Sequence, residues 1–165
     1  MWIEWLTNVK DFISCVQYFI LVMTRTLVQA PLKCRVSSVL NKDRVLYGAQ
    51  NMLSDDISSC WNSDQGSSQF IILDFQRQVH TEQIHLLFQG GFVGQDAVLL
   101  VRTKEEPIQW KELQPFEPVN DNSMQIFPCD AKYVTALKIV FRNSSDFYGR
   151  VIVYQLDVRG REVYE

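Results

Sequence analysis

Side chains that could support catalysis are few in this sequence, and their spacing matches no known catalytic pattern. The two histidines, His80 and His85, belong to neither an H-E-x-x-H helix nor another metal-ligand spacing. The sequence contains no G-x-S-x-G nucleophile elbow and no glycine-rich phosphate loop. Acidic residues such as Asp64 and Asp146 belong to turn-rich stretches, where carboxylates usually face solvent. We therefore expect no enzymatic activity.

The four cysteines, Cys15, Cys34, Cys60 and Cys129, are widely separated in the sequence. No C-x-x-C pair occurs, which argues against a zinc ribbon and against a thioredoxin-type redox site. Four cysteines in 165 residues are also too sparse for a fold built on disulfides. We expect reduced, partly buried thiols, as in a protein of a reducing compartment.

Composition and charge limit the class of partner. The chain has a formal net charge of −3, and its 16 Lys and Arg residues are scattered along the sequence. Binding to nucleic acid needs clustered basic residues that neutralise phosphates, and the sequence shows no such cluster. Direct contact with nucleic acid is therefore not expected. The length fits one domain that can bury its own hydrophobic core.

The first thirty residues contain a mostly apolar run, Phe12–Met23. Twelve residues rise only about 18 Å as a helix, which is short of the ~30 Å hydrocarbon core of a membrane. Three interpretations remain, and we favour them in this order: translation starts at Met23, residues 1–22 are an amphipathic appendage, or they belong to a signal cleaved near Val28–Ala30. The third lacks a basic leading segment. We therefore expect no membrane partner, and a location in the nucleus or cytoplasm rather than secretion.

The remainder of the chain has the pattern of an all-β protein. Apolar residues recur with a period of two, which is typical of strands, and turn-rich stretches separate the runs. A short helix or irregular turn is expected over 46–53. The expected strands cover 71–75, 84–88, 98–102, 124–127, 137–142 and 152–159. The sequence predicts one β-sandwich or barrel domain over residues 23–165, preceded by the N-terminal appendage 1–22.

Four stretches carry a resemblance to a known family: Arg35–Asn41, Cys60–Gly66, Gln89–Phe92 and Asp146–Tyr154. They resemble a family of small proteins that associate with orphan nuclear receptors and act as repressors. The likeness starts near Met23, which supports that residue as the initiator. The resemblance implies a protein-interaction module that represses transactivation by keeping an orphan nuclear receptor off its DNA response element, and we expect it to act as a monomer.

More distantly, the chain is similar to discoidin or coagulation-factor C-type domains, which are galactose-binding-like jelly rolls. The pattern that carries this likeness runs from Leu53 through Trp61 to Phe75. It implies that Trp61 is a core anchor rather than a sugar platform. It also makes a carbohydrate- or phospholipid-binding domain the alternative function, although the candidate tip Gln89–Gly94 has no Lys or Arg to attract anionic lipid.

The discoidin likeness also raises the question of a structural calcium ion. Asp55 and Ser59 match two of the places that hold calcium in many such domains. The late acidic place falls on Gln155, which offers a neutral carbonyl instead of a carboxylate. Calcium prefers several charged oxygens, so we expect no metal and no other cofactor.

No residue is carried over from the family as a binding determinant. Loops on a rigid sandwich concentrate binding residues, so we nominate two partner-binding segments, Gln89–Gln95 and Asp146–Arg150. The simpler alternatives are that Gly90 and Gly91 only form a tight turn, and that Arg150 only pairs with Asp146 within the fold. The nominated residues are Gln89, Gly90, Gly91, Phe92, Asp146, Tyr148 and Arg150.

Overall fold

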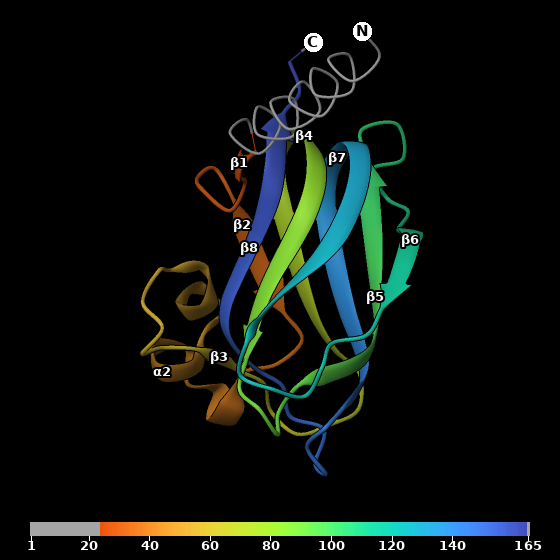
Figure 1. Cartoon of the computed structure of the whole chain (residues 1–165). Helices are drawn as coiled ribbons and strands as arrows, with labels where there is room; N and C mark the ends of the chain where they lie inside the picture. The colour runs from red at the N-terminus through yellow and green to blue at the C-terminus, as the bar shows by residue number, and fades with distance from the viewer. Residues whose placement is uncertain (1–23, 165) are drawn as a thin grey trace, which may run out of the picture.

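The computed structural model describes residues 24–164, so the predicted appendage 1–22 lies outside the described residues. The described chain is an antiparallel β-sandwich, which confirms the predicted all-β class (Figure 1). The strands are β1 (Arg25–Thr26), β2 (Lys33–Val36), β3 (Trp61–Asn62), β4 (Gln69–Phe88), β5 (Gly94–Thr103), β6 (Lys111–Phe116), β7 (Met124–Ser144) and β8 (Ile152–Glu162).

The strands form one continuous hydrogen-bonded path in the order β1-β8-β4-β7-β5-β6. Two short strands lie off this path, because β2 pairs with β4 and β3 pairs with β8. The first half of β4 pairs with β2, whereas its second half pairs with β8. A single strand therefore belongs to both layers of the sandwich.

The crossing of β4 and β7 between the layers corrects the sequence prediction. We predicted separate strands at 71–75 and 84–88, and again at 124–127 and 137–142, but each pair is one long strand. The pairing of β4 with β7 shifts register between Asp74 and Val79, and Gln76 and Tyr133 both adopt positive φ. Such irregularities bend a strand, which lets it turn the corner between two layers.

Strand β6 was missed by the sequence analysis. Its residue Pro115 belongs to a stretch that reads as a turn, yet it pairs with Val98 of β5. Proline is tolerated there because β6 ends the strand path, so its outer edge needs no ladder hydrogen bond. A segment that contains proline can therefore still contribute an edge strand to the sheet.

Trp61 lies in the centre of the core, as predicted. Its side chain has no exposed surface, and its indole Nε1 donates a hydrogen bond to the carbonyl of Ser38 at 2.9 Å. It belongs to the same hydrophobic core as the fully buried residues Phe75, Phe88 and Phe141. Trp61 is therefore a core anchor that also ties down the segment after β2.

Short helical pieces connect β2 to β3 and lie outside the sheet (Figure 1). Asp43 caps the short helix α2 (Arg44–Tyr47) by accepting hydrogen bonds from the amides of Val45 and Leu46. A side chain at Gly48 would meet the Arg44 carbonyl at 2.2 Å, so the turn after α2 requires glycine. No helix within residues 24–164 is long and apolar enough to span a membrane. The pieces are η1 (Leu40–Lys42), α2 (Arg44–Tyr47) and η2 (Ala49–Leu53).

Candidate interaction surface

The two nominated loops meet at one end of the sandwich. We call them the 89–93 loop, between β4 and β5, and the 145–151 loop, between β7 and β8. Val93 and Ser145 exchange two hydrogen bonds: each backbone amide donates, one to the Ser145 hydroxyl and one to the Val93 carbonyl, both at 2.9 Å. The Ile152 amide also donates to the Phe92 carbonyl at 3.0 Å. Segments far apart in sequence thus form one surface.

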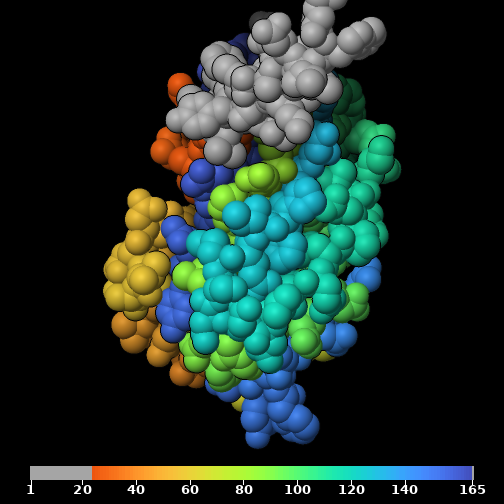
Figure 2. Space-filling model, in the orientation of Figure 1, coloured from red at the N-terminus to blue at the C-terminus, as the bar shows by residue number. Residues whose placement is uncertain are grey.

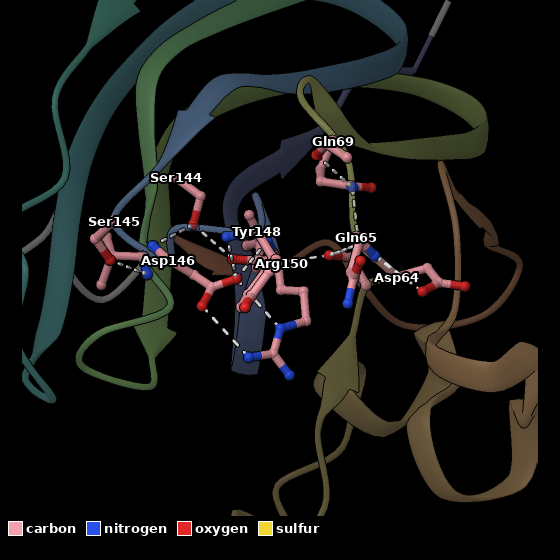
Figure 3. A network of polar contacts seen from close by, with 12 residues as sticks. Asp64, Gln65, Gln69, Ser144, Ser145, Asp146, Tyr148 and Arg150 are labelled. Atoms are coloured by element: carbon pink, nitrogen blue, oxygen red, sulfur yellow. Dashed lines mark hydrogen bonds and ion pairs between the residues drawn. The ribbon is translucent and has the colours of Figure 1, made fainter.

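Arg150 connects the loops through its side chain, which pairs with Asp146 (Figure 3) and lies over Phe92. Its Nε and Nη2 donate to the two carboxylate oxygens of Asp146 at 3.2 and 3.3 Å, which confirms the predicted internal ion pair. The guanidinium also lies over the Phe92 ring, 4.8 Å from the centroid. Arg150 therefore fixes the shape of this surface, and its charge is largely neutralised.

Asp146 organises the 145–151 loop from within. One of its carboxylate oxygens accepts from the backbone amides of Tyr148 and Arg150, at 3.2 and 3.1 Å. Burial alone would raise the pKa of this carboxyl, but the hydrogen bonds and charge of Arg150 outweigh burial and hold the pKa below its ordinary value. The loop is consequently held in one conformation by an ionised carboxylate.

A third loop, 63–68 between β3 and β4, supports the 145–151 loop. The Gly66 amide donates to the Tyr148 carbonyl at 2.9 Å. Gly149 has a φ of +78°, and a side chain there would meet the Gly66 carbonyl at 2.6 Å. The buried amide of Gln69 donates to the carbonyls of Asp64 and Gly66, both at 3.0 Å. The three loops are therefore packed against one another.

Two aromatic side chains project from this rigid base. Phe147 is 94% exposed and Tyr148 is 57% exposed, and their rings meet edge to face with centroids 5.3 Å apart. Figure 2 shows the 145–151 loop as the blue projection at the lower end of the molecule. Phe147 lies within the nominated segment Asp146–Arg150 but was not among the residues named individually. The sequence signal for it is a large apolar residue that lies between turn-forming residues rather than in a strand. The strand pattern therefore gives no reason to expect that this side chain is buried.

The glycine pair lies in a tight turn, as the simpler of its two predicted roles expects. The Phe92 amide donates to the Gln89 carbonyl at 3.0 Å, and Gly91 has a φ of +86°, as in a tight turn. The amides of Gly90 and Gly91 donate to the side chains of Asn122 and Asn120 at 2.7 and 2.8 Å. These groups are engaged within the chain and shape the surface from below.

The residues matched to a calcium site do not assemble one. Asp55 is exposed and lines a pocket of about 230 Å³ together with Gln155 and Asp157. The Asp157 carboxylate is engaged by Thr26 at 2.6 Å and by Arg159 at 3.0 Å. Ser59 instead donates to the Asp56 carbonyl. Within residues 24–164 no group of three or more His, Cys, Asp or Glu side chains could hold a metal. The donor set therefore fits calcium poorly.

The surroundings of the described thiols and of His85 do not activate these side chains for catalysis. Burial raises the pKa of the Cys34 thiol to about 12 and that of Cys129 to about 11. Burial also raises the pKa of Cys60, so none of the three is an activated nucleophile. The pKa of His85 is lowered by burial and then by the nearby Arg159, and its Nε2 lies 3.1 Å from the Gln83 side-chain oxygen.

Comparison with known proteins identifies the family. The chain is 43% identical to the nuclear receptor 2C2-associated protein of Danio rerio, over 85% of this chain and 99% of the relative. It is 38% identical to the Homo sapiens protein of that name, over 86% and 100%. The chain belongs to the nuclear receptor 2C2-associated protein family. The predicted resemblance is thereby confirmed. No model of a protein family matches the chain.

Solved structures confirm the predicted galactose-binding-like fold. An F5/8 type C domain from Bacteroides fragilis superposes with a TM-score of 0.73 at 14% identity, over 86% of this chain and 99% of that domain. A carbohydrate-binding module from Clostridium perfringens, solved with GalNAc-β-1,3-galactose, superposes with a TM-score of 0.68 at 14% identity, over 81% and 99%. At these identities the likeness shows the fold alone.

These relatives and neighbours are named as associated proteins or binding domains, not as enzymes.

Proposed function

We propose that this protein is a non-enzymatic interaction module that binds an orphan nuclear receptor and keeps it off its DNA response element. One observation carries the proposal. Relatives that match 85–86% of this chain, and 99–100% of their own length, are named for association with a nuclear receptor. A likeness over the whole relative supports a shared partner class more strongly than a shared fold does.

The aromatic end of the sandwich is the proposed contact surface. Interface hot spots are rich in aromatic residues that sit on a preordered base, since little conformational entropy is then lost on binding. Phe147 and Tyr148 meet this description because the loops below them are fixed by Arg150 and Gly66. We expect their rings to be buried in an apolar pocket of the receptor.

Repression is proposed to act through occlusion of the receptor. A chain with a net charge of −3 has no electrostatic advantage on a phosphate backbone, so it has to act on the protein. At 19.2 kDa the domain is small enough to reach the nucleus without a dedicated basic signal. The proposed location is therefore the nucleus and cytoplasm.

Titration calorimetry of the purified protein into the receptor tests the association. Wild-type protein should bind, and the double substitution Phe147→Ser with Tyr148→Ser should weaken binding by roughly 10-fold or more. Ile108→Ser is the matched control, because Ile108 is 87% exposed in the β5–β6 loop, and it should leave the affinity unchanged. Equal loss in the control would show that the effect is not specific to this end of the sandwich.

The alternative function, binding of carbohydrate or phospholipid, has its own test. Binding of the purified protein to galactose-bearing glycans on an array, together with no heat of binding to the receptor, would replace the proposal with that of a lectin. Binding of the purified protein to anionic vesicles, again with no heat of binding to the receptor, would replace the proposal with that of a phospholipid-binding domain. Arg150 is engaged by Asp146, so the exposed end offers little charge to an anionic membrane.

A further inference from the structure

A second surface feature is a cleft of about 820 Å³ on the side of the sandwich. It lies between β2 and the η1–α2–η2 segment, and of the three loops at the aromatic end only the supporting 63–68 loop contributes to its described lining, through Asp64. Its polar lining includes Arg35, Ser37, Ser38, Lys42, Arg44 and Asp64. The cleft is therefore a distinct candidate binding site.

The cleft carries an excess of positive charge. Arg35, Lys42 and Arg44 are exposed, and within residues 24–164 none of them pairs with a carboxylate. Asp64 also lines the cleft, but its Oδ1 already accepts a hydrogen bond from the Gln65 amide at 2.9 Å. On a chain that is acidic as a whole, three unpaired cations around one cleft favour an anionic ligand.

One wall of the cleft is an open strand edge. Strand β2 pairs with β4 on one side, and no other described strand pairs with it. The consecutive residues 34–38 all line the cleft, so the cleft follows the course of β2 and of the residues just after it. An unpaired strand edge can hydrogen-bond to an extended peptide, which then adds to the sheet as a further strand.

Ser38, one of the lining residues of the cleft, is held in place by hydrogen bonds. The Ser38 hydroxyl donates to the buried Gln69 side chain at 2.8 Å and accepts from the Asp64 amide at 3.0 Å. The Ser38 carbonyl accepts from the indole of Trp61. A ligand therefore binds a preformed surface, which lowers the entropic cost of association.

We propose that this cleft binds an extended acidic segment of a partner protein, which pairs its backbone with β2 and its carboxylates with Arg35, Lys42 and Arg44. A strand edge favours a peptide over a small anion, because a small anion cannot use the row of backbone groups. The inference goes beyond the proposed receptor contact and does not depend on it.

Fluorescence anisotropy with a fluorescein-labelled peptide of alternating Glu and Val tests the charge requirement. The wild-type protein should bind this peptide saturably, and a Lys–Val peptide of equal length should not bind. Charge reversal by Arg35→Glu, Lys42→Glu and Arg44→Glu together should weaken binding by roughly 10-fold or more, because three ion pairs are lost. All three side chains are exposed, so thermal melts should confirm that the fold is intact.

Matched charge reversal elsewhere is the control. Arg25, Lys111 and Lys132 are exposed and lie outside the lining of the cleft, so their joint substitution by Glu should leave the affinity within about twofold. An equal loss in this control would overturn the proposal, because binding would then follow net charge alone. So would failure of the Glu–Val peptide to bind the wild-type protein.

The strand-addition part is tested separately. Methylation of alternate backbone amides in the Glu–Val peptide should abolish binding, and amide hydrogen exchange of β2 should slow in the complex. Binding that survives methylation would overturn strand addition. Complete displacement of the peptide by inorganic phosphate would assign the cleft to a small anion, and tighter binding of a single-stranded oligonucleotide would assign it to nucleic acid; either result overturns the proposal.

Discussion

The guanidinium of Arg150 lies over the ring of Phe92, 4.8 Å from its centroid, and so joins the loop that precedes β8 to the loop that follows β4. The same guanidinium pairs with Asp146. Because both partners belong to the end of the sandwich that carries Phe147 and Tyr148, this contact sets the position of the exposed aromatic pair.

Arg150→Ala should reduce the free energy of unfolding by about 1–2 kcal/mol, since it removes a cation–π contact and a partly buried ion pair. Urea titration measures the loss. A double-mutant cycle with Phe92→Ala should give a coupling energy of about 0.5–1 kcal/mol. If the two substitutions were additive, the contact would contribute nothing, and the loops would be joined only by the hydrogen bonds of Val93 with Ser145 and of Ile152 with Phe92.

The ionisation of Asp146 should make stability depend on pH in the acidic range. The pKa of this carboxyl is lower in the folded protein than in the unfolded chain, where it is about 3.9. Its stabilising contribution is therefore fully present above the unfolded value and is lost as the pH falls through the lower folded value. Denaturant melts of wild type and Asp146→Asn should differ near neutral pH and converge at the acid end. A constant difference at every pH would exclude an ionised role.

Trp61→Ala should lower the free energy of unfolding by about 3–5 kcal/mol, because a fully buried aromatic side chain leaves a cavity and the Ser38 carbonyl loses its donor. Trp61→Phe is the control, since its phenyl ring retains most of the packing but cannot donate the hydrogen bond to the Ser38 carbonyl. A loss under about 1 kcal/mol for Trp61→Ala, with binding to a partner abolished, would assign Trp61 to a binding platform instead.

Much of the fold follows from the alternation of apolar residues, because a period of two reports directly which face of a strand is buried. The same period cannot show that 71–75 and 84–88 are halves of one strand. The residues between them, Gln76 among them, have a backbone conformation that bends the strand, and no side-chain period encodes that bend.

The candidate surface was only partly predictable for a related reason. The ion pair of Asp146 with Arg150 lies within one loop, so proximity in sequence was enough to anticipate it. The contact of Arg150 with Phe92 depends on the order of strands in the sheet, which pairs β4 with β8. Phe147 was included only as part of a nominated segment, because turn residues are expected to be exposed whatever their type and its position alone did not distinguish it.

A protein that starts at Met23 should fold as the longer chain does. The core side chains of residues 24–164 pack among themselves from Leu27 onward, and β1 already pairs with the end of β8. We expect the free energy of unfolding to change by less than about 0.5 kcal/mol, as for changes away from a core. Loss of the cooperative transition in the truncated protein would show that residues 1–22 are part of the folded domain.

A gel-shift experiment tests the proposed function most directly. The Met23-start protein is titrated into a preformed complex of the orphan receptor with its DNA response element, and the free DNA serves as the control. The proposal predicts that the receptor–DNA band disappears as the protein is added, that the Phe147→Ser, Tyr148→Ser variant leaves it intact, and that the protein alone shifts no DNA. A receptor–DNA band that persists at saturating protein, or a band from the protein and DNA alone, would contradict repression by occlusion of the receptor.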